Sequence, residues 1–426
     1  MSKYSLKQNQ RDAVDFFRKS SLPGSFFWHG MGLGKSLSSL HIAKAIRQIH
    51  LKHGDQTKTL ILCSKSIQVS WETEIRKFCP EERPNIVLLP YSQMHNFVFQ
   101  AKFTDIRLLI IDEYHYLRNA GTKRLENFTK LLIALTYGPK KFENGRIIGL
   151  SGTIIHNSAL DLYNIFALFS SKTIKEAVKK FIDNQGRKRW ASMFSNTAKG
   201  YSGRVKFTGL RNLSILQDIF TPILHKRDID DCEDMPEKSQ YLVDLGIDDD
   251  RLLRYVDVNA PGHFMSELEA LSRAKTPHLI TWIENFLEEN EDEEQLVVFS
   301  MYKAPLKAIQ EHFTDGMVEL ITGDQKLEDR EDVVKRFQEK KVKIIGMTYA
   351  CGAEGLNLQG ARFGLYHSYP WTAALFQQAQ ARIHRSGQKR KTLHYVLTSG
   401  KYDKHIFNTV MRKSKTAEKF DGAIKK

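Results

Sequence analysis

The sequence predicts an α/β protein with two lobes in tandem, each built around a parallel sheet. Three observations predict this class. The chain has 426 residues, which exceeds what one ordinary core needs. Short apolar runs typical of buried strands recur in two series, before residue 170 and after residue 295. Polar or glycine residues follow these runs, as expected at the edge of an open sheet where ligands bind.

The composition is that of a folded protein, with 41% hydrophobic and 27% charged residues. No apolar run approaches the roughly 20 residues of a membrane helix, and the polar start MSKYSLKQNQ differs from a signal peptide. The cysteines lack the spacing of a zinc site or a disulfide framework, which indicates a reducing interior. They are Cys63, Cys79, Cys232 and Cys351.

The net charge of +15 predicts a polyanionic partner such as nucleic acid, although a generic basic surface is the alternative. The charge is uneven. Residues 172–228 hold 13 Lys and Arg against 4 Asp and Glu, and residues 385–426 hold 12 against 3. The acidic run at residues 288–294 is interpreted as a solvated helix end or linker.

The first strand and the turn after it predict a phosphate-binding loop. The apolar run Phe26–Trp28 leads to Met31-Gly-Leu-Gly-Lys-Ser36, and helical periodicity follows over 37–49. Backbone N–H groups of the loop can then face one anion at a helix N-terminus. Lys35 can reach the β- and γ-phosphates, and Ser36 can offer its hydroxyl to Mg²⁺. The full GxxxxGK[ST] pattern has glycine where this chain has His29, so an ordinary turn is the alternative.

The loop is expected to use residues on both sides of its lysine. Backbone groups of Met31, Gly32, Leu33 and Gly34 would cradle phosphates. Gln10 lies about 25 residues earlier, after the start of an amphipathic helix. Its amide both donates and accepts, so it can bond an adenine edge, with a plain surface position as the alternative.

Two further strands predict a polar edge. Thr59–Cys63 is followed by Ser64, Lys65 and Ser66, and 86–89 by Pro90, Tyr91 and Ser92. We interpret Ser64, Lys65 and Ser92 as contacts for nucleic-acid phosphates. Ordinary strand-to-helix loops are the alternative.

Two adjacent carboxylates directly follow the fourth predicted strand. Asp112 and Glu113 directly follow the apolar residues 108–111, and burying two carboxylates is costly unless chemistry uses them. Asp112 can hold the Mg²⁺ shell, and Glu113 can polarise the water that attacks the γ-phosphate. A later strand, 146–150, ends in Ser151-Gly-Thr153 on the same edge.

The middle of the chain, residues 170–230, lacks strand-like repeats and is interpreted as helices and loops projecting from the first lobe. In its run Arg187-Lys-Arg-Trp190, the basic residues could bind phosphates while the tryptophan stacks on an exposed base. The alternative is that the tryptophan is a core residue and the basic residues are solvated.

The second strand series opens at Leu296–Ser300 and continues through Leu320-Ile-Thr-Gly323, 342–348 and 392–398. Thr322, Gly323 and Thr348 lie at strand ends and are expected to face nucleic acid. Gln378, Arg382 and Arg385 follow in QAQARIHR, where a helix would place both arginines on one face. Planar guanidinium groups suit a γ-phosphate in its transition state.

Together these motifs resemble the superfamily-two helicases, and more narrowly the Swi/Snf-type DNA translocases. MGLGKS is similar to motif one, Asp112-Glu-Tyr-His115 with Leu117-Arg-Asn119 to the DExH box, and residues 350–357 to motif five. Residues 378–385 and the GQ at 387–388 resemble motif six. Motif three runs LTGTPIQN in the family, whereas LSGTIIHN at 150–157 departs at Pro and Gln.

The resemblance implies two RecA-like lobes with ATP and Mg²⁺ in the cleft between them. We expect the first lobe over 1–170, a basic helical insertion over 171–235, a connector and the start of the second lobe over 236–295, and the remainder of that lobe, ending in a basic helix, over 296–426. Leu224–Asp228 is similar to the family's connector. Gln378, Arg382 and Arg385 would complete the catalytic set.

The expected function is ATP-dependent translocation or helicase action on double-stranded or branched DNA, in recombination, repair or replication. Alternatives are a chromatin-remodelling-like translocase without strand separation, an RNA helicase, and a non-catalytic DNA-binding scaffold. The GLGKS and HRSGQ signatures disfavour an RNA helicase. We expect a compact, monomeric motor in the cytoplasm of a bacterium or phage-infected host, with no membrane association.

Overall fold

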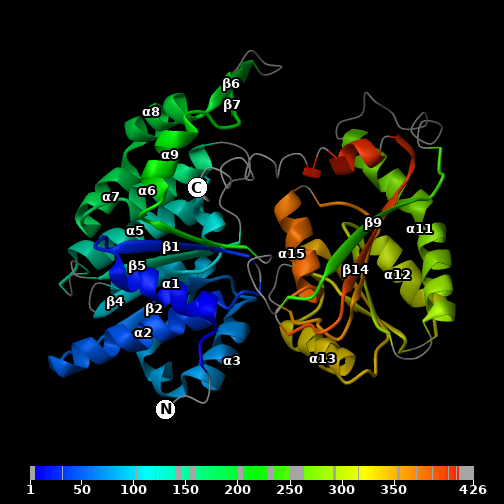
Figure 1. Cartoon of the computed structure of the whole chain (residues 1–426), viewed down its shortest axis with the longest axis horizontal. Helices are drawn as coiled ribbons and strands as arrows, with labels where there is room; N and C mark the ends of the chain where they lie inside the picture. Colours follow the sequence, from blue (N-terminus) through cyan, green and yellow to red (C-terminus); the bar gives the residue numbers. More distant parts are fainter. Residues whose placement is uncertain are drawn as a thin grey trace. The chain divides into compact units, whose positions relative to one another are not determined.

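The computed structural model describes residues 5–30, 32–101, 104–119, 121–139, 142, 145–152, 159–199, 205–228, 235–248, 263–290, 294–314, 316–352, 356–370, 372–385, 387–401, 403–408 and 410–411. The chain divides into two compact units between residues 232 and 233. Each unit contains its own six-stranded parallel sheet, so the predicted α/β class with two RecA-like lobes is confirmed (Figure 1).

The sheet of the first lobe has the strand order β3-β2-β4-β5-β1-β8. All neighbouring strands are parallel, so their C-terminal ends share one edge. The strands are β1 (Gly24–His29), β2 (Lys58–Cys63), β3 (Ile86–Pro90), β4 (Ile106–Ile111), β5 (Arg146–Ser151) and β8 (Leu224–Arg227).

Helices cover both faces of this sheet, which is why its strands are apolar without strict alternation. One face packs against α1 (Gln8–Lys19), α2 (Lys35–Lys52) and α3 (Gln68–Phe78). The other packs against α4 (Met94–Ala101), α5 (Lys123–Tyr137), α6 (Leu160–Phe169) and α7 (Ile174–Ile182). Successive residues of a strand point to opposite faces of the sheet. Phe27 packs on the face covered by α1, α2 and α3, and Phe26 packs on the face covered by α4 to α7.

The segment after α7 differs from the expectation of helices and loops alone. It contains α8 (Asn184–Phe194) and α9 (Leu213–Phe220), but also an antiparallel hairpin of β6 (Asn196–Lys199) and β7 (Val205–Thr208). β8 then pairs in parallel with β1 as an edge strand. Leu224–Arg227, interpreted from sequence as part of a connector, is therefore a strand of the first sheet. The basic charge of the region masked its short apolar signal.

The sheet of the second lobe has the order β11-β12-β10-β13-β14-β9, again parallel throughout. Its strands are β9 (Lys238–Asp244), β10 (Leu296–Ser300), β11 (Val318–Ile321), β12 (Ile344–Thr348), β13 (Phe363–Tyr366) and β14 (Thr392–Thr398). The helices are α11 (His263–Glu289), α12 (Lys303–His312), α13 (Leu327–Gln338), α14 (Tyr349–Gly352) and α15 (Ala373–Ile383). β9 is an edge strand of this sheet and precedes Leu296 in the sequence. The sequence pattern, in contrast, placed the first strand of this lobe at Leu296.

An ion pair is buried inside the second lobe. Lys275 Nζ of α11 donates to Asp403 Oδ2 at 2.8 Å and to Leu397 O at 2.9 Å. Asp403 Oδ2 also accepts from the backbone N–H of Ser399 at 2.9 Å and from the Tyr369 hydroxyl at 3.2 Å. These bonds fasten α11 to the C-terminal end of β14. Among the described residues, no helix is both long and apolar enough to cross a membrane.

Candidate functional site

The predicted phosphate-binding loop lies at the C-terminal end of β1. Gly32 and Gly34 have left-handed backbone conformations, with φ of 78° and 75°, which glycine adopts without a steric penalty. Gly34 is the N-cap of α2, so Lys35 and Ser36 begin an 18-residue helix at its positive end. Lys35 Nζ donates to the carbonyls of His29 at 3.0 Å and Gly30 at 3.2 Å. Met31 lies outside the described residues.

The N-terminus of α1 packs directly on this loop. A Cβ atom at Gly34 would lie 2.0 Å from Gln10 Nε2 and would displace that amide, and the left-handed backbone of Gly34 also disfavours a side chain. Gln10 Oε1 accepts from the backbone N–H of Lys7 at 2.9 Å, and Asn9 Nδ2 donates to Leu33 O at 3.2 Å. The structure therefore brings Gln10 to the loop. Its contact with adenine remains a prediction.

His29 replaces the first glycine of the usual pattern, and the structure explains why it is tolerated. Its ring stacks on Phe27, with centroids 5.3 Å apart, and its Nε2 lies 2.8 Å from His225 Nδ1 of β8. Both rings are buried. Gly30 N–H donates to Arg227 O at 2.9 Å, which extends β8 pairing to the start of the loop. The side chain of His29 therefore packs in the sheet interior.

Burial lowers the pKa of both histidines. The pKa of His29 falls well below 6.5 because of burial, with further lowering by His225 and Lys35. Burial, followed by the charge of Arg227, lowers the pKa of His225 to about 4. One neutral ring then donates the shared hydrogen bond and the other accepts it.

Asp112 lies at the C-terminal end of β4 and is 9% exposed. Trp71 Nε1 of α3 donates to its Oδ2 at 2.8 Å, and the Glu113 backbone N–H donates to its Oδ1 at 3.0 Å. Burial and the neighbouring Glu113 raise the pKa of Asp112 to about 7, while Lys35 acts to lower it. A buried carboxylate whose hydrogen-bond donors among the described residues are neutral suits a bound cation. Asp112 thus has the chemistry that the predicted Mg²⁺ site needs, and Ser36 as a second ligand remains a prediction.

Glu113 has a left-handed backbone with φ of 48°, which is uncommon for a residue with a side chain. Its Oε2 lies 3.1 Å from His115 Nδ1, and that nitrogen is 3.4 Å from Ser151 Oγ at the end of β5. The DExH box therefore contacts the start of the predicted third motif. Trp28 Nε1 holds the same segment by donating to Gly152 O at 3.2 Å. Thr153 to Asn157 lie outside the described residues.

The predicted nucleic-acid contacts of the first lobe follow β2 and β3. Ser64 Oγ accepts from the Ile67 backbone N–H at 3.3 Å and lies 2.9 Å from Ser66 Oγ. Its hydroxyl therefore already supports the turn into α3. Lys65 and Ser92 are exposed at the same edge of the sheet. Whether these residues contact nucleic acid remains a prediction.

The corresponding residues of the second lobe end neighbouring strands. Thr322 and Gly323 follow β11 and Thr348 ends β12, and Ile321 pairs with Met347. Thr322 and Thr348 are both 8% exposed, whereas Gly323 is exposed. The Thr322 backbone N–H donates to Gln325 Oε1 at 2.9 Å, which orders this turn.

The two predicted arginine fingers do not share one helix face. Helix α15 contains Gln378 and Arg382 but ends at Ile383, and Arg385 lies beyond the C-cap His384. His384 ends the helix because its Nε2 is 2.8 Å from Pro236 O, which holds the ring toward β9. The expectation of a helical spacing was therefore wrong. Arg382 is 6% exposed and Gln378 is buried beside it in the same helix.

The segment directly after motif five contacts motif six within the second lobe. The Leu358 backbone N–H donates to Arg382 O at 3.2 Å, and Gln388 Nε2 donates to Gln359 O and Ala361 O at 3.0 and 2.9 Å. Residues 353–355, Trp371 and Ser386 lie outside the described residues.

Sequence reasoning missed two contributors to the site, Trp71 and His225. Trp71 stands at helical spacing from Ile75 and Phe78, which is typical of a core position, and nothing local indicated its bond to Asp112. His225 follows the short apolar pair Ile223-Leu224 and precedes Lys226-Arg227, so no periodic signal marked it as part of a strand.

Comparison with known families agrees with these motifs. A family model for the SNF2-related domain matches residues 9–104, and one for the helicase conserved C-terminal domain matches residues 278–387. The two domains follow one another in the order that the resemblance implied. The identification as a superfamily-two protein of the Swi/Snf type is confirmed.

Known relatives align with almost the whole chain. An uncharacterized ATP-dependent helicase of Mycoplasma pneumoniae is 22% identical over 91% of this chain, and the putative ATP-dependent helicase/translocase YwqA of Bacillus subtilis is 23% identical over 94%. The matches cover 39% and 46% of those proteins, so the chain spans less than half the length of either. The Sulfolobus solfataricus SWI2/SNF2 ATPase core in complex with dsDNA is 20% identical with a TM-score of 0.40, covering 97% of this chain and 92% of that one.

Proposed function

We propose that this Swi/Snf-type protein is a DNA-stimulated ATPase that moves along double-stranded or branched DNA. One observation carries the proposal: the lysine of a glycine-rich loop and a buried carboxylate occupy one edge of one sheet. Lys35 lies near enough to Asp112 to lower its pKa against burial. An ammonium and a carboxylate at this edge suit a nucleotide phosphate and its metal ion.

The ATP phosphates would lie on the loop from Gly32 to Ser36. The glycines allow close approach of the backbone, and α2 directs its N-terminal N–H groups toward the phosphates. Lys35 would exchange its two carbonyl partners for phosphate oxygens. Ser36 and Asp112 would hold Mg²⁺, which neutralises phosphate charge when bound.

Glu113 would orient and polarise the attacking water. Its Oε2 lies 3.1 Å from His115 Nδ1, and that nitrogen lies 3.4 Å from Ser151 Oγ, so His115 stands between the carboxylate and the end of β5. Gln378, Arg382 and Arg385 would assist the same hydrolysis by stabilising charge on the γ-phosphate. Gln10 would bond the adenine.

DNA would contact the polar strand ends of both lobes, at Ser64, Lys65 and Ser92 and at Thr322, Gly323 and Thr348. The net charge of +15 supports a polyanionic partner. Recombination, repair and replication provide the branched substrates that we propose for the motor. Translocation without strand separation is the second mode, and strand-displacement measurements distinguish it from unwinding.

The first test replaces Lys35 with alanine. We expect DNA-stimulated ATP hydrolysis to fall by at least about 10²-fold because the phosphates lose their main cation. Lys52→Ala, an exposed lysine of the same helix, is the matched control and should leave turnover unchanged. Duplex, single-stranded, forked and four-way-junction DNA are compared as activators. Equal activity of wild type and Lys35→Ala would overturn the motor, and equal stimulation by duplex and junction would remove the preference for branched DNA.

The second test replaces Arg385 with alanine. An arginine that stabilises the transition state affects turnover by about 10³-fold, while the KM for ATP changes little. Arg390→Ala is the matched control, because Arg390 is an exposed arginine that pairs with Glu294. Unchanged turnover in Arg385→Ala would exclude its role in hydrolysis.

A further inference from the structure

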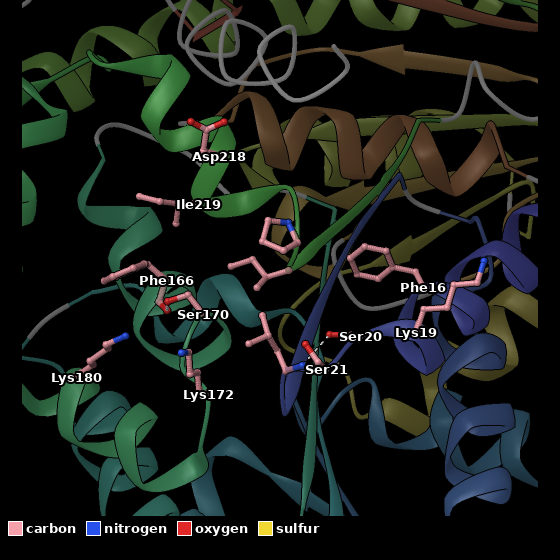
Figure 2. Close-up of a pocket in the computed structure, with 13 residues that line it drawn as sticks. Phe16, Lys19, Ser20, Ser21, Phe166, Ser170, Lys172, Lys180, Asp218 and Ile219 are labelled. Atoms are coloured by element: carbon pink, nitrogen blue, oxygen red, sulfur yellow. Dashed lines mark hydrogen bonds between the residues drawn. The ribbon is translucent and has the colours of Figure 1, made fainter.

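The first lobe has a second cavity at the sheet edge opposite the phosphate loop. It lies where α1 turns into β1 and where α9 turns into β8, before both strands begin (Figure 2). Its volume is about 670 Å³, enough for a few side chains. The N-terminal edge of a parallel sheet is not where its nucleotide binds. The cavity is therefore separate from the site described above.

The walls combine an apolar interior with a basic rim. The apolar lining consists of Phe16, Leu22, Phe166, Ile219, Pro222 and Ile223. Three lysines line the same cavity, Lys19 from α1, Lys172 before α7 and Lys180 within it, against one carboxylate, Asp218. Figure 2 shows Lys19 on one side and Lys172 with Lys180 on the other. A ligand with an apolar centre and negative ends matches this arrangement.

The walls are held in place before any ligand arrives. Arg146 at the start of β5 donates to Phe17 O at 2.9 Å, and its guanidinium lies 4.2 Å from the centroid of the Phe17 ring. Lys180 Nζ lies 5.2 Å from the centre of the Phe166 ring and 2.9 Å from Glu176. Because Arg146 holds α1 and Lys180 of α7 contacts Phe166 of α6, the lysines flank a preformed apolar surface.

The helix ends favour a peptide over nucleic acid. Helices α1, α6 and α9 all end at the cavity, at Lys19, Phe169 and Phe220. A helix C-terminus presents carbonyl oxygens, which accept hydrogen bonds, rather than the N–H groups that cradle a phosphate. A peptide offers carboxylates for the lysines and apolar side chains for the interior. A nucleic-acid backbone offers phosphates and sugar oxygens, but no bulky apolar side chain for the interior.

We propose that this cavity docks an acidic peptide segment of a partner protein, with one or two bulky apolar side chains inside and carboxylates on Lys19 and Lys172. Such short segments anchor through a few buried apolar side chains, while charge fixes orientation and association rate. The proposal is independent of ATP hydrolysis, because the cavity shares no residue with the nucleotide site.

The test measures binding of a fluorescein-labelled peptide, Glu-Glu-Leu-Phe-Glu-Glu, to the full chain without ATP. Comparison peptides replace Leu-Phe by Ser-Ser or every Glu by Lys. We expect only the first peptide to bind. The double variant Lys19→Glu with Lys172→Glu should weaken binding at least about tenfold, which corresponds to about 1.4 kcal/mol. Ile219→Ser, which keeps the charge, should weaken binding about fivefold.

The matched control is Lys58→Glu with Lys123→Glu, which makes the same charge change at exposed positions of the same lobe. This control should bind the peptide like wild type, apart from the small loss due to net charge. Circular dichroism and DNA-stimulated ATPase report whether each variant is folded. Three outcomes would overturn the proposal: equal affinity for all three peptides, equal weakening in pocket and control variants, or displacement of the peptide by duplex DNA with equal potency in wild type and in the control.

Discussion

Two buried carboxylates, one in each lobe, show how differently this chain treats a charge in its interior. Asp403 of the second lobe accepts hydrogen bonds from Lys275, Tyr369 and Ser399. Asp112 of the first lobe accepts from the indole of Trp71 and the backbone of Glu113, and a second carboxylate follows it in sequence. The donors to Asp403 include a full positive charge, whereas those to Asp112 are neutral.

The difference indicates what each carboxylate is for. A buried ion with its counterion and further hydrogen bonds fixes local structure. A buried carboxylate whose donors in the described part of the chain are all neutral costs folding free energy, and its pKa rises to about 7. Such a cost is typical of sites that await a cation. The comparison therefore assigns Asp403 to structure and supports Asp112 as part of the proposed ATP site.

The largest expected effect is at the compensated pair. Lys275→Ala should lower the free energy of unfolding of the second lobe by about 3–5 kcal/mol, because Asp403 stays buried without its counterion. Urea denaturation monitored by fluorescence measures the change. The double variant Lys275→Met with Asp403→Leu is the control and should recover most of the loss. A small loss in Lys275→Ala alone would contradict the structural role.

The next largest effect is a gain in stability rather than a loss. Asp112→Asn should raise the free energy of unfolding at pH 8 by about 2 kcal/mol, without ATP or metal, while abolishing ATP hydrolysis. The folded-state pKa of about 7 exceeds the ordinary 3.8, so the cost of the ionised carboxylate is present above pH 7 and absent below pH 3.8. The advantage of Asp112→Asn should therefore vanish near pH 4. A destabilised Asp112→Asn at pH 8 would contradict an uncompensated charge.

The buried pair His29 and His225 beneath the phosphate loop extends the comparison to neutral groups. An unfolded histidine takes up a proton near pH 6.5, whereas His225 in the folded protein takes one up only near pH 4, because burial lowers its pKa. The free energy of unfolding should thus fall by about 2 kcal/mol between pH 6.5 and pH 4. The charged groups around the pair, Lys35, Arg227 and Asp12, remain in the comparison variant His225→Gln. That variant should lose less stability over this range, and an equal loss would exclude the pair.

The smallest effect is expected one residue after Asp403. Lys404 forms an ion pair with Asp244, but the two side chains are 41% and 49% exposed. Lys404→Ala should therefore change the free energy of unfolding by less than about 1 kcal/mol, and salt should reduce even that. Measuring Lys404→Ala beside Lys275→Ala tests burial directly. Similar losses would show that burial does not separate the two pairs.

The sequence by itself determined the two series of strands and the residues at their ends. Phe26–Trp28 with the glycine loop, and 108–111 with Asp112 and Glu113, are local patterns, because a buried parallel strand must be apolar and its ligand edge polar. Family motifs in the right order then predicted the Swi/Snf type, which comparison with known families confirmed.

Only the tertiary structure decided how distant residues complete these patterns. His225 supports His29 across 196 residues, and Trp71 bonds Asp112 across 41. Helix α15 ends before Arg385, and its C-cap His384 bonds Pro236, two residues before β9. The basic rim of the second cavity combines a lysine of α1 with lysines of α7 and of the segment before it. Each of these contacts depends on the packing of separate elements, which no local periodicity encodes. The loop tolerates His29 in place of glycine because β8 pairs with β1 and its His225 packs on that histidine. The basic sequence of this segment gave no indication that β8 is a strand.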